Sequence, residues 1–185
     1  TAPVECPPEL AGKATCHTGR DGNGSHYLLA VPTDWNRSLV VFSHGGPDVS
    51  YDEESVAEDL VEWSVMIDQG YAWAGSSYRR GGYGVRMAAE DTEAVRKLFT
   101  DRVGRPDRTY LHGQSWGGNV AAKAAETYPG SYDGVLLTSG NVAGGTRAYN
   151  QRVDLRAVYQ FYCHNLPRPD EPQYRCGRGC PLIRR

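Results

Sequence analysis

Ser115 lies in a sequence context that is typical of a reactive nucleophile. It is the central residue of a G-x-S-x-G motif at positions 113–117, between a strand-like run at 108–112 and a helix-like run at 119–127. In this arrangement the serine occupies a tight turn that projects its hydroxyl away from the backbone, and the glycines leave room for the adjoining strand and helix. The helix directs its free N–H groups at charge that develops beside the hydroxyl. The motif predicts acyl transfer through Ser115, and the alternative is a glycine-rich turn without chemistry.

A second motif comes earlier in the chain. Residues 39–43 read as a buried strand, and an H-G-G-P motif at 44–47 follows them directly. With both motifs in this order, the chain resembles the α/β-hydrolase family. The resemblance implies that backbone amides of Gly45 or Gly46 and of Trp116 form an oxyanion hole, which stabilises the tetrahedral intermediate of acyl transfer.

The elements around these motifs alternate between strands and helices. Such alternation predicts an α/β fold with a mostly parallel sheet and helices on both faces. Ligands of such sheets bind at the carboxyl ends of the strands, where both motifs are expected. A hairpin turn is predicted at 33–36, and a capping box of Ser50 and Glu53 should begin a helix that ends near Gly70. The expected strands are 26–32, 39–43, 71–76, 108–112 and 133–138, and the further helices are 87–103 and 119–127.

The resemblance to the α/β-hydrolase fold covers residues 26–140 and looks like the front half of that fold. Residues 1–25 are rich in Pro and Gly, so we expect an irregular N-terminal arm. Residues 141–185 read as the start of a lid followed by an atypical tail with cysteines and paired arginines. We expect the last strands of the sheet to be missing, so that a second chain could complete the fold after processing; a shifted reading frame or a truncated gene would be alternatives.

The family resemblance also implies a catalytic acid and then a histidine after Ser115. His164 is the one histidine there, and its proline-broken surroundings favour a surface or lid position over a catalytic one. Asp133 begins a strand at the wrong end, and Asp154 belongs to a predicted lid helix. We therefore expect the base and the acid to come from outside this chain, and residues 1–185 alone to lack ordinary hydrolase activity.

The motifs are similar to those of the prolyl-iminopeptidase branch of the family. H-G-G-P at 44–47 occurs together with S-W-G-G at 115–118, and R-G-G-Y-G at 80–84 resembles that branch's R-G-x-G loop shifted by one residue. The branch usually carries an acid at the place of residues 77–78 and a glycine at the place of Asp48. These departures argue against aminopeptidase specificity and leave the serine chemistry unchanged.

The expected function is therefore a serine hydrolase that cleaves carboxylic esters, with amides less favoured, and that needs no cofactor or metal. The side chains of His44, Arg80 and Gln114 are candidates for contacting a small-molecule ester or peptide substrate, although a solvated loop arginine is an alternative for Arg80. Two other functions stay open. They are an exopeptidase of the prolyl-iminopeptidase type and a non-catalytic, truncated protein of the same fold.

Charge, hydropathy and cysteine content indicate which partners and which cellular compartment are favoured. The net charge of −2 does not suggest a nucleic acid or an acidic membrane surface as partner, and no apolar run is long enough to span a membrane. Cys6 and Cys16 flank a short stretch with Pro and Gly, which predicts a disulfide in a secreted or periplasmic protein. Cys176 and Cys180 could suggest zinc, but no suitable second pair lies nearby, so a metal site is not favoured.

Overall fold

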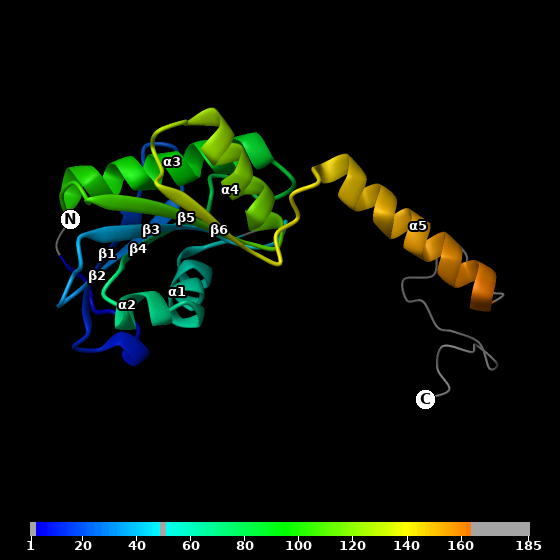
Figure 1. Cartoon of the computed structure of the whole chain (residues 1–185). Helices are drawn as coiled ribbons and strands as arrows, with labels where there is room; N and C mark the ends of the chain where they lie inside the picture. Colours follow the sequence, from blue (N-terminus) through cyan, green and yellow to red (C-terminus); the bar gives the residue numbers. More distant parts are fainter. Residues whose placement is uncertain (1–2, 49–50, 164–185) are drawn as a thin grey trace. The chain divides into compact units, whose positions relative to one another are not determined.

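A six-stranded mixed sheet organises the N-terminal unit of the chain (Figure 1). The computed structural model describes residues 3–48 and 51–163, and contacts divide the chain into units at 1–142 and 143–185. The strand order is β1-β2-β4-β3-β5-β6, in which β4, β3, β5 and β6 run parallel while β1 and β2 are antiparallel to their neighbours. The predicted α/β fold with a mostly parallel sheet is confirmed. The strands are β1 (Ala14–Arg20), β2 (His26–Pro32), β3 (Ser38–Ser43), β4 (Ala72–Ser76), β5 (Arg108–Gln114) and β6 (Gly134–Thr138).

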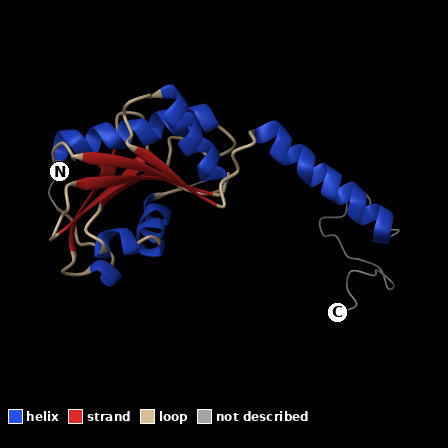
Figure 2. Ribbon diagram, in the orientation of Figure 1, coloured by secondary structure: helices blue, strands red, loops and turns tan. Residues whose placement is uncertain are grey.

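Helices cover both faces of this sheet (Figure 2). On one face lie α3 (Val85–Arg102) and α4 (Trp116–Thr127), and on the other α1 (Glu53–Glu62) and α2 (Val65–Asp68). Successive strand residues point to opposite faces, so Val41 joins the apolar cluster under α3 and α4 while Phe42 joins the cluster under α1. Burial on both faces explains the continuous apolar run of β3.

The helical segment after residue 50 differs from its prediction in two ways. Asp52 is the N-cap of α1, because its side chain accepts a hydrogen bond from the backbone N–H of Ser55 at 3.1 Å; Ser50 of the expected capping box lies outside the described residues. The expected single helix is also interrupted after Glu62. At the interruption Trp63 packs its ring against Phe42 of the sheet.

The N-terminal segment contains regular structure, so the expected irregular arm at 1–25 is wrong for residues 14–20. β1 pairs with the whole of β2, from Ala14 opposite Pro32 to Arg20 opposite His26. The sequence A-T-C-H-T-G-R has few apolar residues because β1 is an outer strand whose residues are mostly half-buried or exposed. A short 3-10 helix, η1 (Pro8–Leu10), precedes it.

The predicted hairpin turn at 33–36 is also wrong. β4 lies between β2 and β3 and hydrogen-bonds with both of them, so the two strands that the turn joins are not neighbours. The segment is a tight connection, since the indole N–H of Trp35 donates to the carbonyl of Ser38 at 2.8 Å. Turn residues alone did not reveal this crossover, because strand pairing depends on the later chain.

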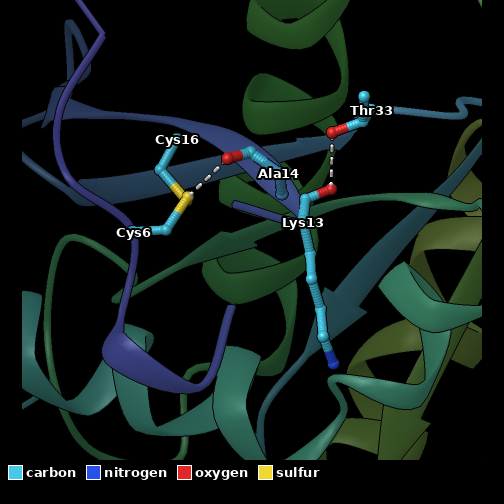
Figure 3. Close-up of a disulfide and its surroundings, with 5 residues drawn as sticks. All are labelled: Cys6, Lys13, Ala14, Cys16 and Thr33. Carbon is cyan, nitrogen blue, oxygen red and sulfur yellow. Dashed lines mark hydrogen bonds between the residues drawn. A yellow bond between two sulfur atoms is a disulfide. The ribbon is translucent and has the colours of Figure 1, made fainter. Parts of the chain in front are cut away.

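The predicted disulfide between Cys6 and Cys16 is confirmed (Figure 3). Cys16 is fully buried in β1, and the bond ties the N-terminal segment to this outer strand. Close by, the Lys13 carbonyl accepts hydrogen bonds from the backbone N–H and the hydroxyl of Thr33, at 2.9 and 3.1 Å. The start of the chain is thus fastened to β1 and to the end of β2.

Loss of the disulfide should destabilise the N-terminal unit. For a loop of this size we expect Cys6→Ser to lower the free energy of unfolding by about 3 kcal/mol, measured by urea unfolding. Because Cys163 is also disulfide-bonded, dithiothreitol should lower the melting temperature of the wild type more than that of the variant. Equal sensitivity of both proteins to dithiothreitol would contradict the expectation, as would recovery of Cys6 and Cys16 as free thiols in peptide mapping.

The C-terminal unit contains the helix α5 (Gly145–Cys163). None of the helices in the described part of the chain is long and apolar enough to span a membrane. Three residues that the sequence singled out, His164, Cys176 and Cys180, lie outside the described residues.

Candidate active site

Ser115 occupies the junction between β5 and α4 in an unusual backbone conformation. Its φ is 52° and its ψ is −119°, a region that non-glycine residues rarely adopt, and its side chain is exposed. Three hydrogen bonds hold this conformation: the Ser115 N–H donates to the Thr138 carbonyl at 3.0 Å, and the Ser115 carbonyl accepts from the N–H groups of Gly118 and Asn141 at 3.1 and 2.8 Å. Strain of this kind persists where surrounding structure enforces it, and it gathers at functional sites.

The two glycines of the motif let α4 approach the sheet closely. A Cβ atom at Gly117 would lie 2.0 Å from the carbonyl oxygen of Ser43 and 2.4 Å from that of His44. A Cβ atom at Gly113 would lie 2.4 Å from the carbonyl oxygen of Gly117. The space that the sequence predicted around Ser115 is therefore needed, because the ends of β3 and β5 and the start of α4 meet there.

The turn after β3 lies directly beside Ser115. β3 and β5 are parallel neighbours, which brings their carboxyl ends to the same edge of the sheet. A Cβ atom at Gly45 would be 3.6 Å from the Cβ of Ser115, and one at Gly46 would be 3.8 Å from the Trp116 ring. The structure thus brings the glycines of the H-G-G-P motif together with the two central residues of the G-x-S-x-G motif.

Three backbone amides at this junction have no hydrogen-bond partner among the described residues. Within residues 3–48 and 51–163, the N–H groups of Gly45, Gly46 and Trp116 donate no hydrogen bond to another protein group. Trp116 is the first residue of α4, where the N–H groups have no partner within the helix and the helix dipole is positive. An oxygen atom with developing negative charge is the ligand that such amides favour.

His44 is buried, and its ring hydrogen-bonds to the backbone of the H-G-G-P turn. Its side chain is only 4% exposed, and its ring stacks on Tyr51 at 3.7 Å and on Tyr78 at 4.2 Å between ring centroids. Its Nδ1 lies 2.6 Å from the carbonyl oxygen of Gly45, so Nδ1 carries the hydrogen and donates it. Burial lowers the pKa of His44 to about 4, and the ring is therefore neutral near pH 7.

No sequence pattern singled out the residues that surround this histidine. The Tyr51 hydroxyl donates hydrogen bonds to the carboxylate of Asp59 and, at 3.3 Å, to the carbonyl of Ser55, both on α1. Burial raises the pKa of Asp59 to about 7, while the bond from Tyr51 opposes that rise. A half-buried carboxyl, linked to the H-G-G-P turn through Tyr51 and His44, was thus found only in the structure.

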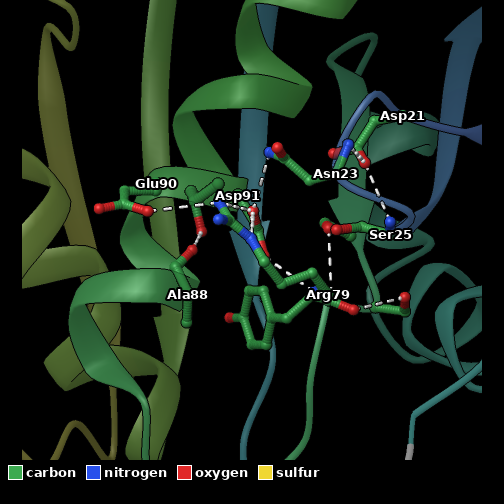
Figure 4. A network of polar contacts seen from close by, with 11 residues as sticks. Asp21, Asn23, Ser25, Arg79, Ala88, Glu90 and Asp91 are labelled. Atoms are coloured by element: carbon green, nitrogen blue, oxygen red, sulfur yellow. Dashed lines mark hydrogen bonds and ion pairs between the residues drawn. The ribbon is translucent and has the colours of Figure 1, made fainter.

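Gln114 and the arginine loop flank the junction. Gln114 donates from Nε2 to the carboxylate of Glu62 on α1 at 3.0 Å. Arg79 is engaged by the fully buried Asp91 of α3, to which its backbone N–H and its Nε both donate at 2.8 Å (Figure 4). The hydrogen bond with Asp91 raises the pKa of Arg79. Arg80, in contrast, is exposed to solvent.

The same loop is joined to the H-G-G-P turn. The backbone N–H of Gly82 donates to the Asp48 carbonyl at 2.7 Å, and the Tyr83 ring contacts the Trp116 ring at 5.6 Å between centroids. The loop that carries Arg80 therefore borders the junction, although its arginine side chain points to no described partner.

The described residues provide no general base for Ser115. Within them, the Ser115 hydroxyl has no hydrogen-bond partner, and His164 lies outside them. His112, next to the motif on β5, has its Nε2 2.7 Å from the hydroxyl of Thr138 and packs its ring against Phe42, and burial lowers its pKa to about 4. This histidine is part of the core. Within the described residues, no group of side chains could hold a metal ion.

Comparison with known proteins places this geometry in a family. The model of a tannase-like family of unknown function, DUF6351, matches residues 20–176. The chain is 26% identical to an o-phthalyl amidase of Xanthobacter agilis over 115 residues. The match covers 60% of the chain and 24% of the amidase. The chain is also 29% identical to a proline iminopeptidase of Thermoplasma volcanium over 118 residues. That match covers 62% of the chain and 38% of the iminopeptidase. The chain thus spans less than half the length of these relatives.

Solved structures share the fold at low sequence identity. A carboxyl esterase from Bacillus coagulans is 16% identical with a TM-score of 0.53, over 86% of this chain and 60% of the esterase. A dienelactone hydrolase from Anabaena variabilis is 16% identical with a TM-score of 0.55, over 69% of this chain and 64% of the hydrolase. At this level of identity the likeness concerns the fold.

Proposed function

The chain belongs to the tannase-like family DUF6351, whose function is unknown, and it has the fold of the α/β-hydrolases. We propose that it is a serine hydrolase that cleaves carboxylic esters through an acyl-enzyme on Ser115. The observation that carries the proposal is the positive φ of Ser115 at the end of β5. A strained, exposed serine between a parallel strand and a helix N-terminus is the arrangement of a nucleophile elbow.

The reaction would proceed in two steps. The Ser115 oxygen attacks the ester carbonyl carbon, and the amides of Gly45 or Gly46 and of Trp116 stabilise the resulting oxyanion. A histidine takes the serine proton and passes it to the departing alcohol, which leaves an acyl group on Ser115. Water then attacks this acyl-enzyme, releases the carboxylic acid and restores the serine.

The base and its orienting acid come, in this proposal, from outside this chain. Two of the described histidines, His44 and His112, support this view, since both are buried and engaged elsewhere. A second polypeptide that completes the fold would supply them. The Cys6–Cys16 disulfide is compatible with a secreted or periplasmic protein, which we include in the proposal.

The substrate is proposed to be a small ester that contacts Arg80 and Gln114 beside the junction. His44 was a further candidate for substrate contact, but its burial between two tyrosines favours a role in holding the turn. Amides are a second candidate class, because two relatives of the chain are an amidase and an iminopeptidase by name.

A fluorophosphonate probe tests the proposal directly. Applied to the complete hydrolase, it should phosphonylate the Ser115 hydroxyl, and peptide mass spectrometry should place the adduct there. Paired p-nitrophenyl esters and p-nitroanilides of the same acyl groups would then separate ester from amide preference. Labelling of another serine would overturn the assignment, and a complete, folded protein without any labelling would support the non-catalytic alternative.

A further inference from the structure

The H-G-G-P turn is held from the inside by a stack of three rings. The His44 ring lies between Tyr51 and Tyr78, with an interplanar angle of 8° to the Tyr51 ring. The stack leaves the Nδ1–H of His44 aimed at the Gly45 carbonyl, 2.6 Å away. Because this hydrogen bond is short and partly shielded from solvent, it fixes the direction of that carbonyl.

The direction of the Gly45 carbonyl determines the direction of an amide. The peptide that joins Gly45 to Gly46 is trans and planar, so its carbonyl and the N–H of Gly46 point to opposite sides. When His44 holds the carbonyl on the buried side, the N–H of Gly46 is turned the other way. That amide is one of the proposed oxyanion donors.

Tyr51 is fixed in turn by α1. Its hydroxyl donates to the carboxylate of Asp59 and to the carbonyl of Ser55, one turn apart on the same face of the helix. Burial raises the pKa of the Tyr51 phenol, which therefore stays protonated and remains a donor. A continuous series of contacts thus runs from α1 through Tyr51 and His44 to the peptide between Gly45 and Gly46.

We propose that Tyr51 and Asp59 are positioning residues of the oxyanion hole, which act through the His44 ring to hold the peptide between Gly45 and Gly46 in its productive orientation. This inference rests on the proposed function of that turn. Neither residue touches the substrate, so their contribution is to the transition state and not to substrate binding.

The charge state of Asp59 should tune this arrangement. The carboxyl of Asp59 faces the phenols of Tyr51 and Tyr78 and the carboxylates of Glu58 and Glu62 on its own helix, and Asp48 lies near the other end of the series. Above about pH 7 Asp59 is a carboxylate, which accepts the Tyr51 hydrogen bond more strongly than a neutral acid does. The turn is therefore held most firmly above pH 7.

The first test measures the turn without any assay of hydrolysis. In nitrogen-15 NMR spectra of the chain, the wild type should show a neutral His44 with a protected Nδ1–H and single amide signals for Gly45 and Gly46. Tyr51→Leu should broaden or split these signals, whereas Tyr71→Leu, at the opposite end of the sheet beside Tyr110, should not. If both variants leave the signals of the turn unchanged while they remain folded by circular dichroism, the proposal is wrong.

The second test uses the complete hydrolase and p-nitrophenyl acetate. Tyr51→Leu should lower kcat about tenfold with KM nearly unchanged, because the loosened donor weakens transition-state binding alone. Asp59→Asn keeps an oxygen that accepts the Tyr51 hydrogen bond, so kcat should be largely retained while the step in its pH profile near 7 shrinks.

Asp59→Leu removes the acceptor and should behave like Tyr51→Leu. An unchanged kcat in Tyr51→Leu, in an enzyme whose Ser115 is labelled by fluorophosphonate, would overturn the inference. A wild type that is not labelled would instead contradict the proposed function, and the NMR comparison would still decide whether the tyrosine holds the turn.

Stability provides a further measurement for Asp59. A carboxyl whose pKa is raised by folding contributes stability that is complete below its ordinary pKa and is lost as the pH rises through about 7. Asp59→Asn does not titrate, so its melting temperature relative to the wild type should rise by about 3 °C or more between pH 5 and pH 8. A constant difference would show that Asp59 does not change its charge in this range.

Discussion

Ser115→Ala should lower the kcat of the complete hydrolase on p-nitrophenyl acetate by about 10⁵–10⁶-fold. Without the hydroxyl no acyl-enzyme forms, and only the oxyanion amides and substrate binding remain to accelerate the reaction. The backbone at this position already has the strained conformation, and alanine preserves the hydrogen bonds of its N–H and carbonyl groups. We therefore expect the variant to fold like the wild type and to bind substrate with a similar affinity.

The measurement is a pre-steady-state assay of p-nitrophenol release. The wild type should show a burst that equals the enzyme concentration when deacylation is slow, and the variant should show none. Ser131→Ala is a matched control, because Ser131 lies in the loop before β6 at the other end of the sheet. Turnover that survives in Ser115→Ala would mean that the strained serine is not the nucleophile.

Gly117→Ala should remove both stability and activity. Its added methyl group would meet backbone oxygen atoms of Ser43 and His44 at 2.0 and 2.4 Å, and neither atom can move without displacing the end of β3. We expect a loss of about 4 kcal/mol or more in the free energy of unfolding, as for overpacking against rigid backbone. Whatever fraction folds should have a displaced H-G-G-P turn and a much reduced kcat.

Urea unfolding followed by circular dichroism measures this loss. Gly22→Ala is the matched control, because a Cβ at Gly22 meets no atom within 4 Å, and its free energy of unfolding should change by no more than about 0.5 kcal/mol. A Gly117→Ala protein with the unfolding midpoint and kcat of the wild type would show that α4 does not approach the sheet as closely as described.

The parallel part of the sheet could be predicted from the sequence, but its antiparallel edge could not. β3 and β4 are buried on both faces, and their apolar runs predict this burial, whereas β5 was found from the motif that follows it. β1 is an outer strand whose composition resembles a loop, and its pairing with β2 depends on contacts that no local pattern encodes. The hairpin expected after β2 was wrong for the same reason, namely that strand pairing depends on distant residues: β4, which pairs with β2, begins 40 residues after β2 ends.

In the candidate site too, some residues could be predicted from the sequence and others could not. Ser115, Gly113 and Gly117 form a motif that is recognisable from the local sequence between one strand and the next helix, although the contact that requires Gly117 is with the distant end of β3. His44 was found by its motif, but its burial was not, because the two tyrosines that enclose it come from different connections. Asp59 had no motif at all, and a carboxylate in the middle of an amphipathic helix is usually a solvated residue.

The hydrogen bonds that hold Ser115 have a consequence for how the protein fails under stress. Its N–H and carbonyl depend on Thr138 and Asn141, which lie at and just beyond the end of β6. Among the described residues β6 pairs with β5 on one side, and Val135 and Leu136 are 43% and 50% exposed, so much of this strand is open to solvent. Elements with few buried contacts open first and at low free-energy cost. Fraying of β6 would relax Ser115 into an ordinary conformation, so in residues 1–185 alone mild heating or denaturant should reversibly remove the strained backbone of Ser115 before the core unfolds.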